Sequence, residues 1–75
     1  MTSAQDFKIR TYGVQELALC YFTNSIPASA SSQLKKWIQH NKKLSVELQD
    51  AGHYSGQKIF TPLQVKIIIA HLGEP

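Results

Sequence analysis

The sequence predicts a mainly α-helical domain of about four helices, with a short N-terminal strand and a small β-hairpin. Apolar residues recur at helical spacing in four segments, and glycine or proline separates these segments from one another. Strand-like alternation is confined to one short stretch near the start. Because 75 residues leave room for only one domain, we expect a single domain over residues 7–75 and a flexible N-terminus over residues 1–6.

The first two elements are a strand and a helix that meet at a glycine. Residues 7–12 (FKIRTY) alternate apolar and polar side chains, which predicts a short strand. With Gly13 as N-cap of a helix over residues 14–22, Glu16 falls at the third helical position, where a carboxylate stabilises exposed N–H groups. The apolar stripe of this helix consists of Val14, Leu17, Ala18 and Tyr21.

A second helix is expected over residues 28–40, after Pro27 at a first helical position or in the preceding turn. Its apolar stripe is formed by Ala30, Leu34, Trp37 and Ile38, and we expect Trp37 to be the main core residue. The opposite face carries Ser29, Ser32, Gln33, Lys36 and His40. Since the helix contains no acidic residue, this face differs from an ordinary solvated face with paired Glu and Lys.

The next segments are a third helix and a ribbon. Asn41 can cap a helix over residues 42–51, and Gly52 is suited to end it in the left-handed conformation. Residues 53–60 are interpreted as a small β-hairpin or an irregular ribbon, because Ser55-Gly56 is a turn signal. Tyr54 in this segment is a candidate for stacking on a base or for a structural role.

The last helix has the clearest boundaries. Thr61 is the expected N-cap, Pro62 stands at the first position, and Gln64 completes a capping box. One apolar stripe consists of Val65, Ile68, Ile69 and Leu72, and a second consists of Leu63, Ile67 and Ala70. The second stripe either belongs to the core or forms the contact face of a homodimer.

Charge is distributed unevenly along the chain. The net charge is +3, and Lys35, Lys36, Lys42 and Lys43 lie close together in the sequence while the acids lie elsewhere. Clustered positive charge is typical of a surface that faces phosphates, although it also suits a solvated helix face. Lys58 adds one exposed charge beside the predicted turn.

Catalytic and metal-binding motifs are missing from the sequence. It contains no G-x-S-x-G, phosphate-binding glycine loop or H-E-x-x-H. The single cysteine, Cys20, is expected to pack as a small hydrophobe, and the three histidines fall on different elements. We therefore expect a protein that is not an enzyme and has no cofactor or metal. The lack of a signal peptide and of a membrane-spanning segment favours a cytoplasmic location.

The order of elements resembles a winged helix-turn-helix domain of the phage excisionase and mercury-regulator kind. The matching stretches are Glu16-Leu17-Ala18 and residues 56–61 (GQKIFT) with Val65. Over nearly its whole length the chain also resembles a family of short bacterial proteins with a domain of unknown function, DUF4248. Its recurring words are matched by YGVQELA, SASSQLKKWI, GQKIFTPLQV and HLGEP. The first resemblance implies that the second helix enters the major groove of DNA and that the ribbon is a wing.

Two functional hypotheses follow. The first is a DNA-binding, regulatory protein in which Ser29, Ser32, Gln33 and Lys36 lie nearest the bases. The phosphate contacts would come from Lys35, His40, Lys42, Lys43 and Lys58, with Tyr54 in the wing. The second is a protein-interaction module that uses the second helix or the stripe Leu63, Ile67 and Ala70. The sequence does not decide the partner.

Overall fold

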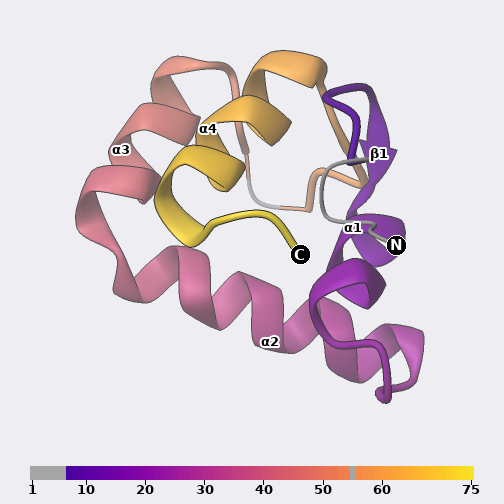
Figure 1. Ribbon diagram of the computed structural model, residues 1–75. Coiled ribbons are helices and arrows are strands. Elements are labelled where there is room, and N and C mark those ends of the chain that lie inside the picture. The colour runs from indigo at the N-terminus through magenta and orange to yellow at the C-terminus, as the bar shows by residue number, and fades with distance from the viewer. Residues whose placement is uncertain (1–6, 55) are drawn as a thin grey trace.

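The computed structural model describes residues 7–54 and 56–75 of the chain. The described elements are, in order, β1 (Tyr12–Gly13), α1 (Val14–Tyr21), α2 (Pro27–His40), α3 (Lys42–Asp50), β2 (Ile59–Phe60) and α4 (Pro62–Leu72) (Figure 1). The prediction of a mainly helical domain with a small antiparallel sheet is therefore confirmed. The expected flexible N-terminus, residues 1–6, lies outside the described residues, and so does Ser55 of the expected turn.

The two strands lie far apart in the sequence but pair with each other. They run antiparallel, with Tyr12 opposite Phe60 and Gly13 opposite Ile59. The predicted strand over residues 7–12 is wrong in extent, because β2 offers only two residues for pairing. Phe7 instead stacks on the Tyr12 ring, with centroids 5.4 Å apart. The described residues of 53–60 form the irregular ribbon, which contributes one strand and runs into α4.

Side chains at the helix starts confirm the expected caps. The Glu16 carboxylate accepts a hydrogen bond from the Gly13 N–H at 3.1 Å. Asn41 accepts one from a backbone N–H in the first turn of α3, also at 3.1 Å. Thr61 accepts one from the Gln64 N–H at 3.2 Å. These bonds satisfy N–H groups that have no partner inside a helix, so the sequence places three of the helix starts correctly.

The helix boundaries differ from the expected ones by at most one residue. α2 begins at Pro27 rather than at residue 28, and proline suits this position because it has no N–H to leave unpaired. α3 ends one residue early, with Ala51 as its C-cap. Gly52 follows with φ +92°, the left-handed conformation that glycine adopts without a steric penalty.

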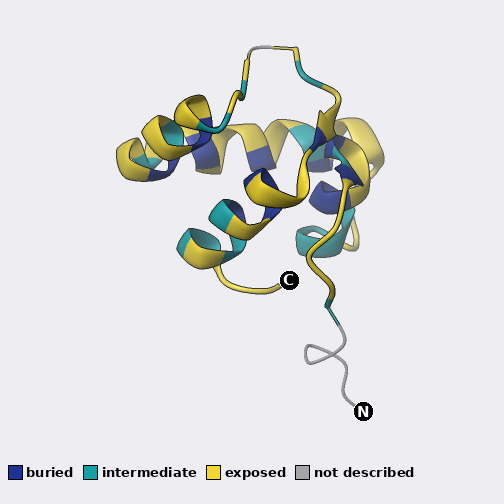
Figure 2. Cartoon of the chain, turned by 90° about the horizontal axis from the view of Figure 1, so that it is seen from above, coloured by how far each residue is buried: buried dark blue, intermediate teal, exposed yellow. Residues whose placement is uncertain are grey.

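One hydrophobic core lies between the four helices and the strand pair of the described chain. Figure 2 shows the buried residues on the inner sides of the helices, with exposed residues on the outer sides. The core consists of Tyr12, Val14, Leu17, Ala18, Ala30, Leu34, Ile38, Leu44, Leu48, Phe60, Val65 and Ile68. Because each helix contributes residues spaced three or four apart, the core follows directly from the sequence periodicity.

The expected role of Trp37 is wrong. Its side chain is 44% exposed, whereas Ala30 and Leu34 are fully buried and Ile38 nearly so. These three lie at spacings of four along one line of α2, and Trp37 lies at the edge of that line. Its ring instead meets the edges of two aromatic rings at the end of α1, Phe22 with centroids 4.7 Å apart and Tyr21 at 6.0 Å.

Candidate nucleic-acid interface

The outward face of α2 is exposed along its whole length. It consists of Ser29, Ser32, Gln33, Lys36 and His40, and each of the five is exposed to solvent. Gln33 donates a hydrogen bond to the Ser25 hydroxyl at 3.3 Å, which ties the start of this face to the α1–α2 connection. The face is therefore free of covering structure within the described chain.

Lys35 lies on a different side of α2 from this outward face. It lines a hollow together with Lys58 of the ribbon and the first turn of α1. The same hollow contains Glu16, but this carboxylate is paired with Arg10 at 2.9 Å. The hydrogen bond from Arg10, with that from the Gly13 N–H, lowers the pKa of Glu16 below its ordinary value. The negative charge in the hollow is thus already compensated.

Lys42 and Lys43 lie at the corner where α2 ends and α3 begins. Asn41 is both the C-cap of α2 and the N-cap of α3, so the two helices are separated by one residue. Both lysines are exposed. Glu47 is the acidic neighbour on the same helix, and its carboxylate is 3.0 Å from the His71 ring nitrogen of α4. The corner extends the positive charge of α2 onto α3.

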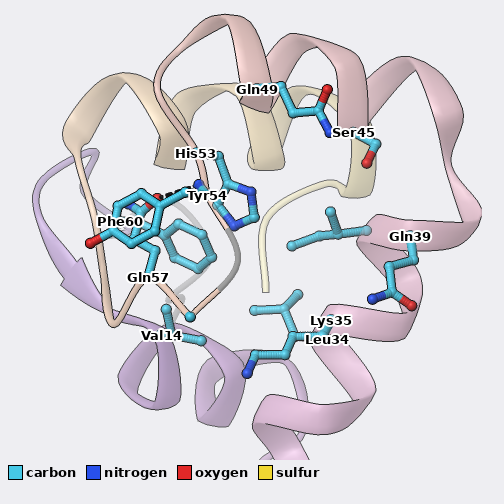
Figure 3. A pocket seen from close by; sticks show the side chains of 12 residues that line it. Val14, Leu34, Lys35, Gln39, Ser45, Gln49, His53, Tyr54, Gln57 and Phe60 are labelled. Carbon is cyan, nitrogen blue, oxygen red and sulfur yellow. Dashed lines mark hydrogen bonds between the residues drawn. The ribbon is translucent and has the colours of Figure 1, made fainter.

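A groove of about 250 Å³ separates α2, α3 and the ribbon (Figure 3). Its floor is apolar and consists of Val14, Leu34, Ile38 and Phe60, all of them core residues. Its rim is polar and consists of Lys35, Gln39, Ser45, Gln49, His53, Tyr54, Gly56 and Gln57. The sequence contained no signal for this groove, because it is formed by three segments that only the fold brings together.

His53 and Tyr54 occupy different places at the groove. His53 projects toward the groove and stacks on Phe60, with centroids 5.9 Å apart, whereas the Tyr54 ring turns away from the centre (Figure 3). Burial lowers the pKa of His53 below its ordinary value, and the positive charge of Lys35 lowers it further. Both effects favour the uncharged imidazole. Tyr54 is 63% exposed, as a stacking residue on the outside of the ribbon would be.

A buried glutamine, Gln64, and a half-buried one, Gln57, hold the ribbon in place. Gln64 is 1% exposed, and its carbonyl oxygen accepts hydrogen bonds from the Thr61 N–H at 3.0 Å and the Gln57 side chain at 2.6 Å. Its amide group donates to the Ala51 carbonyl at 3.2 Å. Gln57 in turn accepts from the Tyr54 N–H at 3.3 Å. The capping box indicated the helix start, but nothing in the sequence indicated that Gln64 is buried.

Cys20 does not have the environment of a nucleophile. Burial, and to a lesser degree the charge of Glu16, raise the pKa of its thiol, which favours the unreactive protonated form. Its sulfur lies 3.4 Å from the Glu16 carbonyl oxygen in the same helix. Among residues 7–54 and 56–75, no group of three His, Cys, Asp or Glu side chains could hold a metal ion. No helix in this part of the chain is long and apolar enough to cross a membrane.

The second apolar stripe of α4 is divided between core and surface. Leu63 is 57% exposed and Ala70 is exposed, whereas Ile67 is half-buried and packs against the core. Lys66, also exposed, lies between them on the same side of the helix. The stripe is therefore a small apolar surface interrupted by a charge.

Comparison with known proteins identifies the family. The model of the family described as a domain of unknown function, DUF4248, matches residues 8–75. The chain belongs to the DUF4248 family. No curated protein and no solved structure matches the DUF4248 chain significantly. The family match covers every described element, so the resemblance to this family is confirmed, whereas the winged helix-turn-helix likeness stays a hypothesis.

The fold of the DUF4248 protein sorts the predicted site residues into three groups. Ser29, Ser32, Gln33, Lys36 and His40 lie together on the outward face of α2. Lys42 and Lys43 lie at the corner with α3. Lys35 and Lys58 share a hollow beside the ribbon, and Tyr54 lies on the ribbon itself. All ten are exposed, but they lie on different sides of α2, at the start of α3 and on the ribbon rather than on one surface.

Proposed function

We propose that this protein binds double-stranded nucleic acid, most plainly DNA, through the outward face of α2, in the manner of a small winged helix-turn-helix regulator. The observation that carries the proposal is that α2 presents an exposed face without a single acidic residue. Lys42 and Lys43 extend the positive charge onto the α3 corner, and Lys35 and Lys58 add charge on another side of α2, beside the ribbon. A surface of this kind offers several positive charges to phosphates and the hydroxyl groups of Ser29 and Ser32 to base edges. The Gln33 amide, beside its hydrogen bond to Ser25, keeps a second N–H and its carbonyl oxygen for the same purpose.

The small residues at the start of α2 support close approach to a duplex. Ser29 and Ser32 have short side chains, so the backbone of the first two turns can lie near the floor of a groove in the duplex. Gln33, one turn after Ser29, can both donate and accept a hydrogen bond at a base edge. Lys36 and His40 follow on the same face, at the distance where the phosphate backbone would pass. The winged arrangement is part of this proposal, with the ribbon and Tyr54 beside α2.

The proposal is tested by titrating mixed-sequence duplex DNA at two salt concentrations. With about four phosphate contacts, binding should weaken roughly 100-fold between 50 and 200 mM salt. Lys36→Glu should weaken binding further by removing one contact and adding repulsion. The matched control is Lys66→Glu on α4, which changes the net charge equally at a site away from α2. Equal losses in both variants, or no binding at low salt, would refute the assignment of α2.

A second candidate function is binding of a partner protein. The observation that favours it is that two large apolar side chains are exposed, Trp37 on α2 by 44% and Ile26 at the start of α2 by 67%. Tryptophan is enriched among residues that dominate protein interfaces. This candidate predicts that Trp37→Ala abolishes partner capture while duplex binding is unchanged. Measuring the molecular mass at high concentration tests self-association through Leu63, Ile67 and Ala70, which predicts a dimer.

A further inference from the structure

The groove between α2, α3 and the ribbon combines an apolar floor with unengaged polar side chains. Its volume of about 250 Å³ is below the roughly 300–1,000 Å³ typical of sites for drug-sized ligands. A hollow of this size suits a single flat ring. No acidic side chain belongs to its described lining, so it does not repel an anionic ligand. We propose that this groove binds the base of a single nucleotide, with the phosphate directed toward Lys35.

An aromatic surface for the base is present at the groove wall. His53 projects toward the groove from the ribbon, and the packing of its ring against Phe60 fixes its orientation (Figure 3). Burial and Lys35 lower the pKa of His53 and so favour its uncharged ring, which can lie against a base without the cost of desolvating a charge. Stacking on a fixed aromatic ring is the usual way in which proteins hold unpaired bases.

Hydrogen-bonding groups for the edge of the base are supplied by two helices. Gln39 of α2 and Gln49 of α3 lie at the rim on either side of Ser45 (Figure 3). The structure shows no hydrogen bond from these three side chains to another described residue, unlike Gln57, which is committed to Gln64. An amide side chain can pair with a base edge through one donor and one acceptor at once. The groove thus has free groups where a base edge would lie.

A positive charge lies at the end of the groove that opens toward α1. Lys35 lines both the groove and the neighbouring hollow, and Lys58 of the ribbon lines that hollow as well. Their two ammonium groups can contact the phosphate of a nucleotide whose base occupies the groove. The groove lies on another side of α2 from Lys36 and the outward face, so this proposal does not depend on duplex binding.

The test is an NMR titration of the full ¹⁵N-labelled chain with each nucleoside monophosphate, with ribose 5-phosphate as the probe that lacks a base. We expect saturable shifts at Gln39, Gln49 and His53 with the nucleotides only. His53→Ala should weaken nucleotide binding roughly 5- to 100-fold, the loss seen when a stacking ring is removed. His53→Phe keeps a stacking ring and should retain binding. Equal affinity for ribose 5-phosphate would overturn the proposal.

A matched pair of variants on α2 separates the groove from general charge effects. Gln39→Glu replaces the amide at the base edge with a carboxylate that cannot donate a hydrogen bond, and it adds a negative charge to the groove of an anionic ligand. Nucleotide binding should therefore weaken at least roughly fivefold. Gln33→Glu makes the same change on the outward face, and binding should stay within about twofold because solvent and salt screen that charge. Equal effects in both variants would refute the groove as the site.

Two nucleotide sources are distinguished by a third probe, a short single-stranded oligonucleotide. If the nucleoside monophosphates bind at the groove residues as well as the oligonucleotide, the groove is a site for free nucleotides. Binding of the oligonucleotide alone at those residues indicates a site for an unpaired base within a strand. Shifts confined to the outward face of α2 with either probe would overturn the proposal, even if duplex DNA binds there. Loss of duplex binding in Lys36→Glu with unchanged nucleotide binding would show two separate sites.

Discussion

Replacing the buried Gln64 with alanine should destabilise the protein strongly. The Gln64 side chain makes hydrogen bonds to three residues, Thr61, Gln57 and Ala51, and is almost fully buried. At about 1 kcal/mol for each lost bond the cost is about 3 kcal/mol. The loss of the one buried methylene group, Cγ, adds about 0.8 kcal/mol. We therefore expect Gln64→Ala to lower the free energy of unfolding by about 3–4 kcal/mol.

This loss is large for a domain of this size. A folded chain of 75 residues is typically stable by roughly 4–11 kcal/mol, so one side chain would account for a third or more of the total. The physical reason is that the Ala51 carbonyl and the Thr61 N–H lose their partner together, and Gln57 loses the bond that anchors the ribbon. The variant should therefore also loosen the ribbon before the whole domain unfolds.

The assay is urea unfolding followed by Trp37 fluorescence and, independently, by circular dichroism. Gln49→Ala is the matched control, because Gln49 is exposed on α3 and its side chain has no hydrogen bond to another described residue. The control should change the free energy of unfolding by less than about 0.5 kcal/mol. If Gln64→Ala costs less than about 1 kcal/mol, the buried amide does not hold the ribbon and the reasoning is wrong.

Two further predictions concern stability and pH. Leu34→Ala should lower the free energy of unfolding by about 2–5 kcal/mol, and Trp37→Ala by less, about 1–2 kcal/mol, because Leu34 is fully buried and Trp37 is half-exposed. Urea unfolding of both variants measures the two losses, and a larger loss for Trp37→Ala would contradict the prediction. Because Arg10 and the Gly13 N–H lower the pKa of Glu16 in the folded chain, the stabilisation by Glu16 is present above its unfolded pKa and is lost as the pH falls through the folded value. An NMR titration of Arg10→Gln should show that pKa returning toward normal, and an unchanged value would contradict the pairing.

Local signals in the sequence were sufficient for the helices. Asn41, Thr61 and the prolines at residues 27 and 62 mark helix starts through backbone hydrogen bonding that depends only on near neighbours. The spacing of apolar residues indicated which side of each helix turns inward. The family resemblance was likewise available from the sequence, because it depends on stretches of five to ten residues that match the family's recurring words.

The candidate site was predicted only in part. The exposed face of α2 could be inferred, since a helix that buries Ala30, Leu34 and Ile38 must expose the opposite side. The separation of Lys35 from Lys36 could also be inferred from their angle around the helix, but which of them lies beside the ribbon could not. The groove and the place of His53 within it were missed, because its lining comes from segments far apart in the chain.

The sequence by itself determined the four helices, their caps and the bare outer side of α2, because each depends on interactions between residues a few positions apart. Only the tertiary structure decided that β1 pairs with β2, that Trp37 stays at the surface and that Gln64 is buried between the ribbon and α3. These features depend on how helices with similar apolar faces are placed against one another. That placement is a property of the whole packed core, and no local pattern of residues records it.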